Sequence, residues 1–152
     1  MKRVIFLILI WTSLLSSQTI KTGDRRNGYQ GIWFELTQKS EYGDKYSGGL
    51  GTYTAKHHPL AVYSDITDKT FFVYGGAANP TSRQLLAMLS YYDHQTGMAP
   101  RPVVVHAKPD VIDPHDNPSL QIDAEGYLWI FVSGRANIRP GYIYKSAKPF
   151  SI

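Results

Sequence analysis

The sequence contains no cysteine, which excludes disulfide scaffolds, thiolate zinc sites and cysteine nucleophiles. It also has little net charge, because 16 basic and 12 acidic residues give a formal charge of +4. Two of the basic residues, Lys2 and Arg3, belong to an N-terminal segment that we expect to be removed. The mature chain is then close to neutral, which argues against a nucleic-acid partner, because such proteins neutralise many phosphates. A length of 152 residues limits the chain to about one domain.

The longest apolar run lies at the N-terminus, where residues 4–15 are interrupted only by Thr12 and Ser13. The run is too short for a membrane-spanning helix, which needs about 20 apolar residues. A cationic start precedes it and small residues follow it, which is the order of a secretory signal peptide. We therefore predict a signal peptide over residues 1–17, a mature chain over residues 18–152 without a membrane span, and a secreted or periplasmic location. An uncleaved anchor is the alternative.

Aromatic residues make up 13% of the chain and accompany 13 Gly and 9 Pro, a mixture that favours strands and turns. The fold class predicted is all-β. Residues 85–89 also fit a helical turn on propensity, but the Tyr pair and the turn that follow favour a strand. The expected strands cover residues 60–63, 70–74, 85–92, 102–106, 118–122 and 127–132. Residues 71–74 and 127–132 are nearly continuously apolar, so we expect interior strands that are buried on both faces.

The strand pattern restarts after about 59 residues, with Pro118 in the place of Pro59. Each unit consists of a strand, a short turn, a very apolar strand and an exit that contains glycine. Repeated four-stranded antiparallel units are typical of β-propeller blades. The chain holds about two such blades, whereas closure needs roughly four to eight, so we interpret it as the N-terminal piece of a propeller of about seven blades. A β-sandwich with two similar hairpins is the alternative.

The densest polar cluster, residues 111–117, directly precedes the first strand of the second unit. His115 can exchange a proton near neutral pH, and Asn117 can donate to a carboxylate or an oxyanion. Arg135 follows the next strand, so antiparallel pairing places it at the same end of the hairpin, where it can bind an anion. These three residues are the predicted catalytic group. The alternative is that Asp116 and Asn117 cap a turn and that His115 is an exposed loop residue.

A second polar cluster, residues 55–59, precedes the first strand of the first unit and contains His57 and His58. Neighbouring residues of an extended segment point to opposite sides, so at most one histidine faces a shared site. Adjacent histidines are a poor chelate, and we predict no metal and no cofactor. The predicted substrate-binding residues are His57, Tyr53 and Arg139. Tyr53 can stack on a sugar ring or, equally, pack on a sheet surface.

Three stretches of the sequence resemble the BNR-4 repeat family, namely residues 28–34 (GYQGIWF), 41–53 (EYGDKYSGGLGTY) and 115–120 (HDNPSL). This family comprises secreted β-propeller proteins and includes ulvan lyase-like polysaccharide lyases. The resemblance implies that His115 is catalytic within the central channel and that His57 faces the same channel. The lyases have a second catalytic histidine about one hairpin later, a place that falls near Arg135 in this chain. Their further catalytic Tyr and Arg residues lie in later blades.

These patterns lead to two hypotheses about function. The first is an exported enzyme that cleaves an acidic polysaccharide by β-elimination, a reaction that needs a base, an acid and a group that neutralises the uronate carboxylate. His115 is the candidate base or acid, and Asn117 and Arg135 are the neutralising groups. The second is a non-catalytic propeller that binds a glycan or a protein with the same rim. A glycosidase is less favoured, because no pair of carboxylates lies on neighbouring strand ends.

Overall fold

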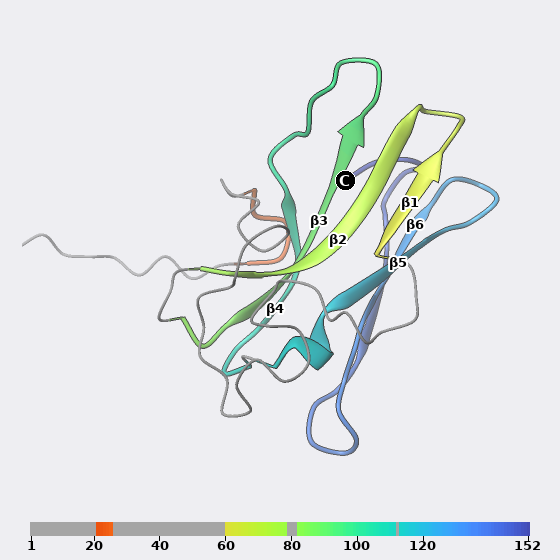
Figure 1. Ribbon diagram of the computed structural model, residues 1–152. Coiled ribbons are helices and arrows are strands. Elements are labelled where there is room, and N and C mark those ends of the chain that lie inside the picture. Colours follow the sequence, from red (N-terminus) through yellow and green to blue (C-terminus); the bar gives the residue numbers. More distant parts are fainter. Residues whose placement is uncertain (1–20, 26–59, 79–81, 112) are drawn as a thin grey trace, which may run out of the picture.

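The computed structural model describes residues 21–25, 60–78, 82–111 and 113–152 (Figure 1). Seven strands form two antiparallel sheets, so the all-β class is confirmed. In these ranges the only helical element is a 3-10 turn, η1 (Pro114–Asp116), and no helix has the length and apolar character needed to cross a membrane. The predicted signal peptide, Tyr53 and His57 lie outside the described residues.

The first sheet contains four strands in sequential order, β1-β2-β3-β4. Their bounds are Ala61–Ser64, Lys69–Ala77, Leu85–Asp93 and Val103–Lys108. All four strands lie where the sequence predicts them. The helical alternative for residues 85–89 is wrong, because β3 pairs with β2 on one side and with β4 on the other along this stretch.

The second sheet contains three strands in the order β5-β6-β7, with bounds Pro118–Ile122, Leu128–Val132 and Tyr142–Lys145. The sequence predicts β5 and β6 but not β7, whose short run follows a loop with Pro140 and Gly141. The turn between β5 and β6 is organised by the carboxylate of Asp123. Its Oδ1 accepts the backbone N–H groups of Glu125 and Tyr127 at 3.0 and 2.9 Å, and its Oδ2 accepts Nε1–H of Trp129 at 2.8 Å.

The two sheets pack against each other through one shared apolar core. The first sheet contributes Phe71, Val73, Ala87, Leu89 and Val105, and the second contributes Leu120, Leu128, Ile130 and Val132. The opposite face of the first sheet is buried as well, around Tyr74, Leu86, Met88 and Val104. Successive side chains of a strand point to opposite faces, so β2 and β3 are buried on both.

Burial of β6 differs from the sequence-based expectation. The strand lies between β5 and β7, as predicted for an interior strand. The expectation that this strand is buried on both faces is wrong, however. Leu128, Ile130 and Val132 point into the core, while Phe131 faces outward and is 38% exposed. The apolar outward side chain explains why the sequence pattern resembled that of a doubly covered strand.

Candidate functional site

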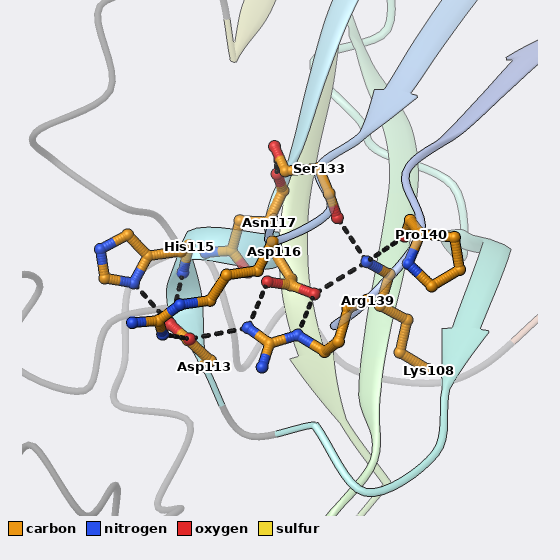
Figure 2. Close-up of polar contacts among 9 residues, drawn as sticks. Lys108, Asp113, His115, Asp116, Asn117, Ser133, Arg139 and Pro140 are labelled. Atoms are coloured by element: carbon orange, nitrogen blue, oxygen red, sulfur yellow. Dashed lines mark hydrogen bonds and ion pairs between the residues drawn. The ribbon is translucent and has the colours of Figure 1, made fainter. Parts of the chain in front are cut away.

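A cluster of charged side chains lies at one end of the second sheet, where three separate segments meet (Figure 2). Lys108 is the last residue of β4, and Asp113, His115 and Asp116 lie in the connection that leads through η1 to β5. Arg135 and Arg139 come from the loop between β6 and β7. The register that pairs Pro118 with Val132 places the start of β5 beside the end of β6, so both segments converge here.

Asp113 is the centre of the exposed part of this cluster. Its Oδ1 accepts the backbone N–H of His115 at 3.0 Å and contacts the ring Nδ1 of the same residue at 2.6 Å. Its Oδ2 accepts Nη1–H of Arg135 at 2.5 Å and Nη2–H of Arg139 at 2.8 Å. Burial alone would raise the pKa of Asp113, but the hydrogen bonds from these three residues outweigh it and hold the pKa well below its usual value.

The carboxylate of Asp113 fixes the orientation and the tautomer of His115. Because Asp113 stays ionised at neutral pH and can only accept, the Nδ1 atom of His115 carries a hydrogen and donates a hydrogen bond to Oδ1. Proton exchange with a substrate would then use Nε2, the other ring nitrogen. The side chain is 32% exposed, so solvent reaches it. A histidine oriented by a carboxylate in this way is the common arrangement of a general base.

Asp116 forms the buried part of the cluster together with Lys108 and Arg139. Arg139 binds its carboxylate in bidentate fashion, with Nε at 2.9 Å from Oδ2 and Nη2 at 2.8 Å from Oδ1. Lys108 Nζ donates to the same Oδ2 at 2.8 Å and also to the backbone carbonyls of Ser133 and Pro140. Hydrogen bonds to Asp116 raise the pKa of Arg139 despite its partial burial. These contacts connect β4 of the first sheet to the second sheet.

Arg135 is the most accessible cation of the cluster. Its side chain is 41% exposed, whereas Arg139 and Lys108 are largely covered. Among the described residues, the three cations face two carboxylates, Asp113 and Asp116, which leaves an excess of one positive charge even when His115 is neutral. An accessible guanidinium in a cluster of net positive charge is suited to bind an anionic group.

The structure brings together three of the residues singled out from the sequence. His115, Arg135 and Arg139 all contact Asp113. Asn117 lies next to them but is buried, and its backbone carbonyl accepts the hydroxyl of Ser133 at 3.5 Å. Tyr53 and His57 lie outside the described residues. The catalytic and binding roles of all six stay predictions.

Sequence reasoning missed the residues that hold the cluster together, Lys108, Asp113 and Asp116. Asp116 was considered as a turn cap and, with Asp113, as a carboxylate pair too close in one loop for a glycosidase, and Lys108 was not singled out. The pairing of Lys108 with Asp116 depends on the packing of two sheets, which no local pattern encodes. The one available signal was the presence of two carboxylates within four residues of a histidine.

Among the described residues, no other histidine is paired with a described carboxylate. A cavity of about 390 Å³ lies between the two sheets, but the described residues that line it include no histidine or carboxylate. Its walls are mainly apolar, with Leu89, Val103, Leu128 and Ile130 among them. In the described part of the chain, no three His, Asp or Glu side chains gather closely enough to hold a metal ion.

Comparison with known proteins gives no match: neither a family model, nor a curated protein, nor a solved structure is similar to this chain. The function must therefore be inferred from the chemistry of the cluster. Its two features are a histidine held by an ionised carboxylate and an accessible arginine on the same carboxylate.

Proposed function

We propose that this protein is an exported carbohydrate-active protein that cleaves a uronate-containing polysaccharide by β-elimination. The observation that carries the proposal is the shared contact of His115 and Arg135 with Asp113. A candidate base and a candidate carboxylate-binding group thus contact the same carboxylate. The resemblance of residues 115–120 to the BNR-4 family, which includes polysaccharide lyases, supports the same reaction class.

In this proposal His115 Nε2 accepts the proton from the carbon next to the uronate carboxylate. The electron pair left on that carbon forms the new C=C bond, and the C–O bond to the leaving sugar breaks. The imidazolium then returns its proton to the leaving oxygen, so that atoms and charges balance. Arg135 neutralises the uronate carboxylate and thereby stabilises the carbanion-like transition state.

The test is to incubate the protein with a panel of acidic polysaccharides and to follow the ultraviolet absorbance of the unsaturated uronate product. His115→Ala should lower the rate by about 10² to 10⁴-fold, the usual contribution of a general acid–base group. Arg135→Ala should weaken binding, most strongly at low salt, where an exposed charge is least screened. His94→Ala is the matched control, because His94 lies in the exposed turn after β3 and contacts Thr70 instead. An unchanged rate for His115→Ala would contradict the proposal.

A non-catalytic glycan- or protein-binding module is the second candidate. The observation that favours it is the internal pairing of the cluster, since Arg139 is bound by both carboxylates and Asn117 is buried. Arg135 also occupies the region where the resemblance leads us to expect a second histidine. Polysaccharide binding that yields no unsaturated product and is unaffected by His115→Ala would favour this candidate over the lyase.

We also propose that the two sheets are neighbouring blades of a β-propeller. The support is the restart of the strand pattern at Pro118 and the sequential strand order within each sheet. The reading frame in the source genome tests this proposal. Further four-stranded units at a similar period would support it, and an in-frame stop codon directly after Ile152 would contradict it.

The proposed location is outside the cytoplasm. The support is the order of the N-terminal segment, a cationic start followed by an apolar run and by Ser16 and Ser17. N-terminal sequencing of exported protein should give a chain that begins near Gln18. Exported protein that begins at Met1 would contradict a cleaved signal peptide.

A further inference from the structure

A stack of three rings joins the two sheets beside the charged cluster. His106 of β4 lies against Tyr142 of β7, with ring centroids 4.1 Å apart and ring planes inclined by 33°. The Nδ1 atom of His106 is 2.6 Å from the hydroxyl of Tyr144, the second tyrosine on the same face of β7. The contacts hold the Tyr142 ring in one orientation.

The stack is continuous with the cluster that contains the proposed catalytic residues. Lys108 lies two residues after His106 on β4, and its Nζ is 5.8 Å from the centroid of the Tyr142 ring. The same Nζ binds Asp116, which in turn binds Arg139. An aromatic surface and a set of cationic groups therefore lie side by side.

Tyr142 remains partly open to solvent although one side of its ring is covered by His106. The residue is 38% exposed, in contrast to the well-buried aromatic side chains Phe71 and Tyr74 of the first sheet. Burial and the nearby Lys108 lower the pKa of His106, so the stack is uncharged at neutral pH. A rigid, neutral and partly exposed aromatic ring binds flat apolar surfaces with little loss of conformational entropy.

We propose that Tyr142 is a stacking surface for one pyranose ring of the polysaccharide bound at the cluster. A pyranose ring presents several C–H groups on one face, and this face packs on an aromatic ring while the hydroxyl and carboxylate groups point outward. Arg135, the most accessible cation of the cluster, would then contact the carboxylate of a sugar in the same chain. The inference rests on the proposed function, because it specifies a sugar-binding subsite of that site.

The experiment measures binding of two probes, hexagalacturonate and the uncharged cellohexaose, to the full chain by isothermal titration calorimetry. Tyr142→Ala should weaken binding of hexagalacturonate about tenfold, the upper range for an aromatic stacking contact. Tyr142→Phe should retain wild-type affinity, because it keeps the ring. Tyr92→Ala is the matched control, because Tyr92 is 41% exposed on β3 and its ring contacts His94 instead of the cluster. Thermal unfolding of each variant identifies any that fails to fold.

The outcomes separate the subsite from the proposed function. Wild-type binding of hexagalacturonate that Tyr142→Ala does not weaken would overturn the subsite and leave the function standing. A loss of affinity in Tyr142→Phe equal to that in Tyr142→Ala would overturn it too, because the ring would not be what matters. Binding of cellohexaose alone, with the same dependence on Tyr142, would support the subsite and contradict a preference for uronates. Binding of neither probe would overturn both.

Discussion

The two sheets are built from similar strands but are stabilised in different ways. In the first sheet, β2 and β3 bury apolar side chains on both faces. In the second sheet only the face toward the shared core is buried, and the outward face exposes Phe131 and Ile143. The second sheet is also fixed at one end by the ionic cluster around Asp113 and Asp116. Apolar packing therefore dominates the stability of the first sheet. The second sheet adds polar contacts, and these contacts belong to the candidate site.

The largest expected difference concerns two phenylalanines on the central strands of the two sheets. Phe71→Ala should destabilise the protein by about 3–5 kcal/mol, because Phe71 of β2 is fully buried in the shared core and its removal leaves a cavity. Phe131→Ala on β6 should cost about 1 kcal/mol or less, because that ring is partly exposed. The free energy of unfolding from urea titration measures both. Equal costs would show that the outward face of the second sheet is covered in solution.

The contacts of Lys108, which connect the two sheets, should have the next largest effect on the free energy of unfolding. Lys108→Met should destabilise the protein by about 3 kcal/mol, because it breaks a buried ion pair and leaves two carbonyls without their lysine donor. Lys69→Met is the matched control, since Lys69 and Asp93 form a partly exposed pair at 4.0 Å, and the loss of such a solvent-screened pair should cost much less. Urea unfolding of both variants gives the comparison. A near-neutral Lys108→Met would mean that apolar packing alone holds the sheets together.

Acid should lower the free energy of unfolding partly through Asp113, which lies at the same end of the second sheet. The folded-state pKa of Asp113 is lowered, so the unfolded state binds a proton more readily and stability falls as the pH drops. This contribution is fully present above the unfolded pKa of about 4 and is lost as the pH falls below it. Asp113→Asn should therefore flatten the dependence of unfolding free energy on pH below about pH 4. An unchanged slope would show that Asp113 contributes nothing to acid sensitivity.

The smallest effect on stability is expected on the outward face of the second sheet. Ile143 of β7 is 65% exposed, so Ile143→Lys should change the unfolding free energy by less than about 0.5 kcal/mol. The open edge of β7 should favour self-association, and the same change should reduce it, because a charged residue on an edge strand opposes pairing with another sheet. Sedimentation velocity measures the association. Val105→Lys provides the contrast, because Val105 belongs to the buried core and its replacement should prevent folding.

Much of the candidate site could be predicted from the sequence, because its residues flank strands that the sequence identifies. The positions of β5 and β6 place His115 and Arg135 at the same end of one hairpin, as antiparallel pairing requires. Arg139 joins them because the loop between β6 and β7 folds back through a bridge with Arg135. The strand β7 itself was missed, since a four-residue run after Pro140 and Gly141 is too short for a reliable alternation pattern.

The sequence by itself determined the all-β class and most of the strands, because strand propensity, apolar runs and turn residues are local properties of the chain. Only the tertiary structure decided which faces are buried, since an outward Phe131 and an inward Phe71 belong to equally apolar runs. It also decided the partners of the charged residues. Lys108 meets Asp116, and Asp113 orients His115, because two sheets pack with these segments at a common end, and such contacts depend on the packing of the whole chain.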